Sequence, residues 1–234
     1  KPIEDKITKE FGPFMANTHT ESNQTGSFMT NAYHHAKKII KEHVNAGPDD
    51  AILLDGFGMT SVINKFQRIL GLRIPEKWES RLELKPEERP VVFITHREHH
   101  SNHTSWLETI SDVVIVEPDR KGNVCPEQLE RQLQSYSNRP LKIGAFTACS
   151  NVTGLITPYH ELAGVMHKHG GICVVDFAAC APYVSMNMHP DNPAEQLDAI
   201  CFSPHKFLGG PGTSGALIFN KNIHYPVAVY YILY

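Results

Sequence analysis

The sequence lacks the features of proteins that bind nucleic acid or enter a membrane. Its formal net charge is only −3, because 22 Lys and Arg residues are scattered among 25 Asp and Glu residues. Binding to phosphate backbones or anionic lipid uses a basic patch, and no basic stripe is present. No apolar run approaches the roughly 20 residues that span a bilayer. We therefore expect neither a nucleic-acid partner nor a membrane.

Paired cysteines are also absent. The chain has five cysteines, an odd number, without a CxxC pair, and three of them lie in apolar, strand-like stretches. Small proteins held by disulfides show an even number of cysteines instead. The pattern therefore predicts reduced thiols and a cytoplasmic location. The five are Cys125, Cys149, Cys173, Cys180 and Cys201.

What the chain does contain is an alternation of short apolar runs and helical patterns. The runs are rich in β-branched residues and nearly continuous, which is typical of strands buried on both faces. Helical segments separate most of them, so the sequence predicts an α/β domain with a mostly parallel sheet. The expected strands are 51–55, 91–95, 113–117, 142–147, 172–176, 199–203 and 216–219. The expected helices are 60–70, 126–136, 158–170 and 30–45, the last with Ala32, Ala36, Ile39, Ile40 and Val44 on one face.

The loop after the first strand has the composition of an anion site. Parallel sheets bind ligands at the carboxyl ends of their strands, so the residues that follow each run are candidates. Here the sequence is DGFGMTS, residues 55–61. Glycines before a helix free backbone N–H groups for a phosphate, and the hydroxyls of Thr60 and Ser61 add to the helix dipole. The alternative is a simple turn capped by Thr60.

Four histidines follow the second strand. His96, His99, His100 and His103 are spaced i, i+3, i+4 and i+7, so a helix would place them on one face. Their order differs from HExxH, and no Cys or carboxylate partner is evident. We favour a polar helix start with one or two histidines facing a pocket over a metal site.

An acid and a lysine end two later strands. Asp176 closes the run ICVVD, and Lys206 follows in SPHK, before a run of glycines. Taken singly, Asp176 fits a cap and Lys206 a surface residue. Adjacent strand ends would bring both to one crevice. A lysine amine, an acid beside a pyridine nitrogen and a helix N-terminus for a phosphate are what pyridoxal 5'-phosphate (PLP) requires.

Five motifs carry a resemblance to known enzymes. They are DGFGMTSVINK, EHHSNHTSW, CSNVTG, VVDFAACAP and SPHKFLGGPGTSGALIF, in this order. Together they resemble the class V aminotransferase family of PLP-dependent enzymes over about residues 30–220, in particular cysteine desulfurases and selenocysteine lyases. The resemblance implies PLP as the cofactor. It also implies the large domain of fold type I, a three-layer α/β/α fold with a mostly parallel seven-stranded sheet.

The resemblance assigns the chemistry to three residues. Lys206 would form the Schiff base with the cofactor and then move the proton of the substrate α-carbon. Asp176 would pair with the protonated pyridine nitrogen. His99 would stack on the cofactor ring and assist proton transfer. The catalytic residues implied are therefore Lys206 and His99.

Five further residues would hold the cofactor by the same resemblance. Thr60, Ser203 and His205 would bind the phosphate. Asn151 would hydrogen-bond the 3-hydroxyl oxygen of the ring, and Ala178 would pack on the ring face opposite the stacking histidine.

The chain also departs from the family pattern. Ala179 stands where desulfurases usually carry a Gln, three residues after the acid, so the environment of the 3-hydroxyl differs. The arginine that binds the substrate carboxylate, the persulfide-forming cysteine and the small C-terminal domain are expected outside this chain. We expect an N-terminal segment and helix over residues 1–50, a PLP-binding domain over 51–220 and an atypical tail over 221–234, at an apparent truncation.

These expectations favour a PLP-dependent enzyme that acts on a small amino acid with cysteine desulfurase-like lyase or sulfurtransferase chemistry, as a homodimer. An aminotransferase or another lyase of the same family is the close alternative. A non-catalytic cofactor-binding fragment is a third interpretation, since residues that read the substrate are expected elsewhere.

Overall fold

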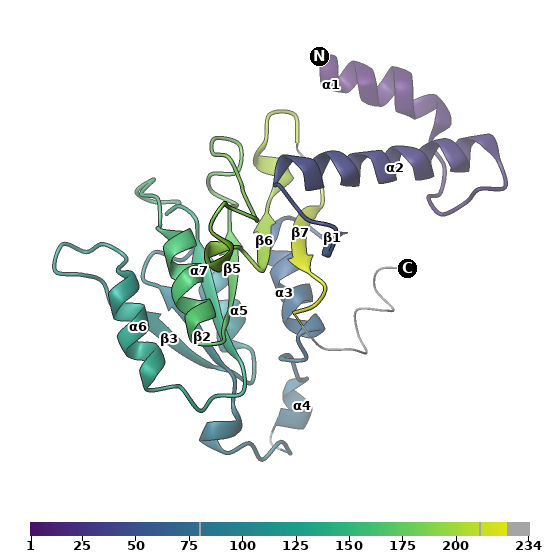
Figure 1. Cartoon of the computed structure of the whole chain (residues 1–234). Helices are drawn as coiled ribbons and strands as arrows, with labels where there is room; N and C mark the ends of the chain where they lie inside the picture. Colours follow the sequence, from purple (N-terminus) through teal and green to yellow (C-terminus); the bar gives the residue numbers. More distant parts are fainter. Residues whose placement is uncertain (80, 211, 224–234) are drawn as a thin grey trace.

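The computed structural model describes residues 1–79, 81–210 and 212–223 (Figure 1). The strands are β1 Asp50–Asp55, β2 Val91–Thr95, β3 Asp112–Val116, β4 Lys142–Thr147, β5 Ile172–Asp176, β6 Ala199–Phe202 and β7 Gly215–Asn220. The helices are α1 Pro2–Asp5, α2 Gln24–His43, α3 Met59–Ile69, α4 Glu76–Glu79, α5 His100–Leu107, α6 Pro126–Gln134 and α7 Tyr159–Lys168. Most of the tail expected over 221–234 lies outside the described residues.

The strands form one mixed sheet in the order β1-β7-β6-β5-β4-β2-β3. The strand β7 runs antiparallel to both of its neighbours, β1 and β6, and the strands from β2 to β6 are parallel to one another. The sequence therefore predicted the strands correctly, with ends that differ by one residue. The register places Thr147 of β4 opposite Asp176 of β5, and Asp176 opposite Cys201 of β6. Three neighbouring strands thus end side by side.

Two apolar cores lie on the two faces of the sheet. On one face, α6 and α7 bury Leu129, Leu133, Leu162 and Met166 against the strands. On the other face, α3 and α5 bury a second cluster that includes Met59, Val62, Ile63, Phe66 and Trp106. This confirms the three-layer α/β/α architecture. It also explains the continuous apolar runs, because strands covered on both faces have no polar side.

The helix α2 differs from its prediction at its start and on its apolar face. It begins at Gln24 rather than residue 30, where the side chain of Asn23 caps it by accepting a 2.7 Å hydrogen bond from the amide of Gly26. Val44, directly after the helix, is fully buried, whereas Ile39 is 51% exposed. Only the C-terminal end of α2 lies over the body of the domain in Figure 1, whereas Gly26 and Thr30, which are buried, lie in its N-terminal part. No helix in the described ranges is both long and apolar enough to cross a membrane.

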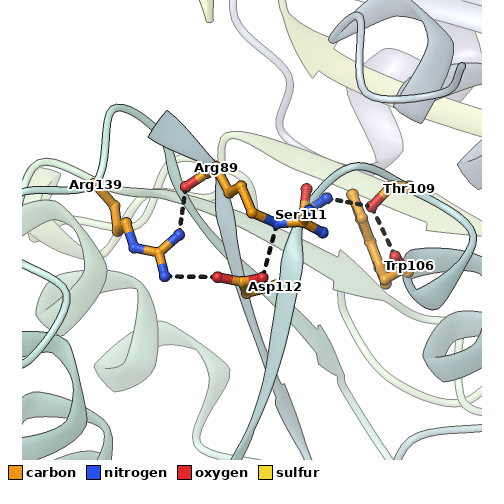
Figure 2. A network of polar contacts seen from close by, with 6 residues as sticks. All are labelled: Arg89, Trp106, Thr109, Ser111, Asp112 and Arg139. Atoms are coloured by element: carbon orange, nitrogen blue, oxygen red, sulfur yellow. Dashed lines mark hydrogen bonds and ion pairs between the residues drawn. The ribbon is translucent and has the colours of Figure 1, made fainter. Parts of the chain in front are cut away.

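An ion-pair network fixes the amino ends of three strands (Figure 2). Asp112, at the start of β3, accepts hydrogen bonds from Arg89 Nε at 3.0 Å and from Arg139 Nη2 at 2.6 Å. Arg139 also donates to the carbonyl oxygen of Arg89 at 2.8 Å. Beside it, the amide of Ser111 donates to Thr109 Oγ1 at 3.2 Å. The network therefore lies at the edge opposite to the carboxyl strand ends.

Candidate functional site

A cavity of about 250 Å³ opens at the carboxyl ends of the parallel strands. Such an edge is where open α/β sheets bind ligands. Every site residue expected from the sequence lines this cavity: Thr60, His99, Asn151, Asp176, Ser203, His205 and Lys206. These residues come from five separate segments of the chain, each at the carboxyl end of a strand. The sheet therefore brings together side chains that are up to 146 positions apart.

The amino end of α3 forms one wall of the cavity. The helix begins at Met59, with Gly58 as its N-cap, so Thr60 lies in the first turn and does not cap the helix as the alternative interpretation had it. Gly58 has a φ of 78°, a conformation that side chains other than glycine rarely adopt. The amide of Met59 donates a 2.8 Å hydrogen bond to Ser203 Oγ. This bond ties the helix start to the end of β6.

The backbone packs very closely at this wall. A Cβ atom built on Gly58 would overlap the His205 ring and lie 3.0 Å from Ser203 Oγ. A Cβ atom built on Gly215, the first residue of β7, would overlap the carbonyl oxygen of Gly58. Both positions therefore require glycine. The first-turn amides of α3, two hydroxyls and an imidazole are held together as a cradle suited to an anion.

Asp176 lies at the floor of the cavity, at the end of β5. Its residue surface is 5% exposed, and its Oδ1 accepts a 2.8 Å hydrogen bond from the amide of Ala178. Burial raises the pKa of Asp176 to about 6, while the hydrogen bond from Ala178 and the positive charge of Lys206 act in the opposite direction. A carboxylate buried in this way favours a nearby cation.

Lys206 ends a short 3₁₀ turn, Pro204–Lys206, that follows β6. The turn is closed by a 3.0 Å hydrogen bond from the amide of Lys206 to the carbonyl oxygen of Ser203. The Lys206 side chain is exposed and lines the cavity. Its positive charge lowers the pKa of Asp176, against the larger effect of burial. An exposed amine next to a buried acid is positioned to react with a ligand that contacts both groups.

His99 lies at the boundary of α5, between His96 in the preceding loop and His100 and His103 in the helix. It is the N-cap of α5, where its Nδ1 accepts a 3.1 Å hydrogen bond from the amide of Ser101. His96 lies before the helix, and its Nε2 is 3.2 Å from the carbonyl oxygen of Gly122. The spacing therefore does not place both on one helical face. In the described part of the chain, no three His, Cys, Asp or Glu side chains are grouped to hold a metal ion.

The remaining wall comes from the loops after β4 and β5. Asn151 lies in an exposed turn after β4 and faces the cavity. Ala178 and Ala179, directly after β5, also line it. Their small side chains leave room above the floor for a flat ring. The loop after β4 is held by a 2.8 Å hydrogen bond from the amide of Ala148 to the carbonyl oxygen of Asp176.

The sequence analysis missed the roles of two residues, one behind the cavity wall and one on it. Glu98 accepts hydrogen bonds from Thr95, Asn102 and Thr147, and burial raises its pKa to about 7. Cys149 lines the cavity and lies close enough to Cys180 to add to the effect of burial, which raises the pKa of the Cys180 thiol. For Glu98 the only signal was its place beside His99. For Cys149 there was none, since the contact forms between two separate loops.

The residues of the cavity fit PLP. Its phosphate requires an anion cradle, which the start of α3 with Ser203 and His205 provides. Its pyridinium requires a carboxylate, which Asp176 provides at the buried floor, and its aldehyde requires an amine, which Lys206 provides. Three different chemical groups of one ligand thus find partners in one cavity.

Comparisons with known proteins agree with this fit. The sequence model of the family described as aminotransferase class-V matches residues 1–227. A probable cysteine desulfurase of Halalkalibacterium halodurans is 27% identical over 230 residues, which are 96% of this chain and 51% of that protein. A cysteine desulfurase of Synechococcus elongatus is 25% identical over 212 residues, which are 89% of this chain and 31% of that protein. The chain therefore spans about half or less of these relatives.

Solved structures show the same fold. A NifS-like protein from Rickettsia africae superimposes with a TM-score of 0.72 at 18% identity, over 95% of this chain and 55% of that protein. A cysteine desulfurase from Thermococcus onnurineus superimposes with a TM-score of 0.68 at 20% identity, over 93% of this chain and 50% of that protein. With the sheet order, the cavity and the sequence match in agreement, the chain belongs to the class V aminotransferase family, whose members depend on PLP.

Proposed function

We propose that this chain is the cofactor-binding part of a PLP-dependent enzyme that releases sulfur from L-cysteine. The observation that carries the proposal is the single cavity that unites Lys206, Asp176 and His99 with the amino end of α3. The similarity to cysteine desulfurases over most of the chain supports the choice of substrate.

Each residue has a separate task in this proposal. When bound, PLP supplies an electron sink for the α-carbon of an amino acid. Lys206 holds the cofactor through Nζ and later moves a proton at the substrate α-carbon. Asp176 keeps the ring nitrogen protonated, because its buried carboxylate stabilises the positive charge on that nitrogen. His99 packs on the ring and assists proton transfer.

The phosphate is held at the other end of the cavity. Thr60, Ser203 and His205 offer two hydroxyls and an imidazole beside the first-turn amides of α3. Asn151 contacts the 3-hydroxyl oxygen, and Ala178 packs on the ring. Since Ala179 replaces the Gln of desulfurases, the contact to that oxygen rests on Asn151 in this chain.

The proposal extends to the assembly and the setting. We place the enzyme in the cytoplasm, as a homodimer. All five cysteines are free, and four of them are buried, which agrees with a reducing compartment. Sedimentation of the purified chain with and without PLP measures the assembly, and a monomer under both conditions would contradict the dimer.

The cofactor assignment is tested by trapping. The chain is incubated with PLP, reduced with borohydride, digested and mapped by mass spectrometry. The expected result is one phosphopyridoxyl group on Lys206. Lys206→Ala should abolish this label, whereas Lys221→Ala, at an exposed lysine that pairs with Asp49, should retain it. A folded chain without label at Lys206 contradicts the proposal.

The substrate is tested on the same preparation. The PLP-loaded chain is given L-cysteine, and sulfide and alanine are measured beside keto acid formed with an amino acceptor. Dithiothreitol is included as the two-electron reductant, because the sulfur leaves at the oxidation level of a persulfide, and sulfide with an equal amount of alanine is then expected. Keto acid as the main product would identify an aminotransferase instead. Labelling of Lys206 without either product would identify a cofactor-binding fragment without turnover.

A further inference from the structure

Glu98 occupies a junction behind the cavity wall. It lies between the end of β2 and the start of α5, directly before His99. The residue keeps part of its surface exposed, but its carboxyl group is enclosed. An enclosed carboxyl group is costly unless it is hydrogen-bonded, so its partners show what the residue holds.

The carboxyl group of Glu98 accepts four hydrogen bonds. Its Oε1 accepts from the amide of Thr95 at 3.2 Å, from Thr95 Oγ1 at 2.7 Å and from the amide of Thr147 at 2.9 Å. Its Oε2 accepts from Asn102 Nδ2 at 2.8 Å. The four bonds therefore join the end of β2, the end of β4 and the first turn of α5.

The bond to Asn102 extends the junction into the core. Asn102 is 1% exposed, and its Nδ2 also lies 3.3 Å from the carbonyl oxygen of Ala145 in β4. Its Oδ1 accepts a 3.0 Å hydrogen bond from Trp106 Nε1. The start of α5 is thus anchored to the sheet through Glu98 and Asn102, and the backbone between these two anchors carries His99.

Charged and titratable groups surround the junction. Asp176, on the next strand beyond β4, raises the pKa of Glu98, and Cys201 of β6 responds to both carboxyl groups. His99 follows Glu98 directly in the chain. Because Glu98 does not line the cavity, its influence on a ligand passes through these neighbours.

We propose that Glu98 is a positioning residue that fixes His99 at the cavity by joining the ends of β2 and β4 to α5. The proposal rests on the proposed function in assigning His99 to the cofactor ring. Glu98 acts through the backbone segments that it holds in place, and its carboxyl group makes no contact with the ligand.

The first test reads this junction without cofactor. Amide hydrogen exchange is measured by mass spectrometry for the parent chain, Glu98→Ala and a control, Glu108→Gln, at the exposed opposite end of α5. Exchange in peptides that cover Thr95–Asn102 and Thr147 should rise about tenfold in Glu98→Ala, because local opening becomes easier. The control should match the parent. Unchanged exchange in Glu98→Ala overturns the proposal.

The second test asks whether Glu98 acts through His99. Glu98→Gln keeps the size of the side chain but turns an amide against Asn102 Nδ2, so this variant remains foldable while the bond to α5 is lost. The dissociation constant of PLP is measured for Glu98→Gln, His99→Ala and the double variant. Glu98→Gln should weaken binding about tenfold in the parent and less than about twofold in the His99→Ala background.

The outcomes separate this inference from the proposed function. The role through His99 is overturned if the two single substitutions weaken PLP binding by factors that multiply in the double variant. It is also overturned if the Glu98→Gln chain binds PLP as tightly as the parent. A parent chain that fails to bind PLP contradicts the proposed function. The hydrogen-exchange measurement then still decides whether Glu98 holds the junction of β2, β4 and α5.

Discussion

The backbone amide of Met59 donates a 2.8 Å hydrogen bond to the hydroxyl of Ser203, across 144 positions of the sequence. It joins the first residue of α3 to the residue that follows β6, so the anion cradle is held by the sheet and not by the loop alone. A substitution that breaks this bond should therefore lower both the free energy of unfolding and the affinity of the cradle for a phosphate.

Ser203→Ala removes the acceptor and leaves the amide of Met59 buried without a partner. Such a loss costs about 1–3 kcal/mol, and we expect a decrease of this size in the free energy of unfolding, measured with urea. PLP affinity should fall as well, because the cradle loses a hydroxyl. Ser137→Ala, at an exposed turn after α6, is the matched control and should change neither quantity. Equal behaviour of both variants would contradict the role of this bond.

Gly58 offers a test of crowding that is separate from backbone strain. Gly58→Ala places a methyl group against the His205 ring at a φ of 78°. Gly122 has a φ of 80° with open space around its missing Cβ, so Gly122→Ala carries the strain without the overlap. Both variants should lose about 1–3 kcal/mol of stability from the strained backbone conformation. Only Gly58→Ala should also lose PLP binding, measured by titration; equal affinity in both variants contradicts the cradle.

Asp176 makes stability depend on pH in a direction that is unusual for an acid. Burial raises its folded pKa to about 6, whereas in the unfolded chain the pKa returns to about 3.9. Between these values the folded state keeps a proton that the unfolded state has lost, so the free energy of unfolding falls as pH rises from about 4 to about 6. The full effect is about 3 kcal/mol.

Urea unfolding at a series of pH values, for the parent chain and Asp176→Asn, measures this effect. The quantity to compare is the difference between the two proteins, in which carboxyl groups remote from Asp176 cancel. The pKa of Glu98 is raised mainly by burial and in addition by Asp176, so Glu98 contributes to the difference in the same direction. The parent should lose stability relative to Asp176→Asn as the pH rises through this window. A difference that stays constant from pH 4 to pH 7 would contradict the raised pKa.

The sequence predicted the sheet well because its strands are covered on both faces. A continuous apolar run such as Val91–Thr95 or Ile172–Asp176 has few alternatives to a buried strand, and both were placed without error. Asp176 and Lys206 were expected in one crevice for a related reason. Each follows a strand of the same sheet, and the strand direction alone brings them to one edge.

Other features depend on contacts that no local pattern contains. The bonds of Glu98 join residues 95, 102 and 147, so its role is set by the packing of β4 against β2. His99 was expected on a helical face but is the N-cap of α5, because the helix begins at the next residue, His100. The start of α2 was missed since its first turns lie away from the sheet and carry a weak apolar pattern.

The ion-pair network at the amino ends of the strands should contribute to stability but not to PLP affinity. Asp112→Asn should remove much of the pairing with Arg89 and Arg139, of which the second is only 13% exposed. Hydrogen bonds to charged partners contribute about 1.5–3 kcal/mol when enclosed, and partial exposure lowers the expected loss to about 1 kcal/mol. PLP affinity should stay unchanged, because the network lies opposite to the cavity. A loss of affinity in a variant that remains folded would contradict this separation.

The thiols give an independent measure of the cavity. Cys125 is partly exposed, whereas burial raises the pKa values of Cys173 and Cys201 well above the ordinary range of a thiol. Cys149 lies on the cavity wall. Iodoacetamide at pH 8, followed by peptide mapping, should therefore modify Cys125 first and Cys149 next, since the thiolate is the reactive form and access limits the rest.

Bound PLP should slow the modification of Cys149 and leave that of Cys125 unchanged, because only the first thiol borders the space that the cofactor fills. Cys125 thus serves as the control within the same molecule. Modification of Cys173 or Cys201 before Cys149 would show that the wall is not open as described. Equal slowing of Cys125 and Cys149 would contradict protection by contact, because it would indicate that PLP tightens the whole chain.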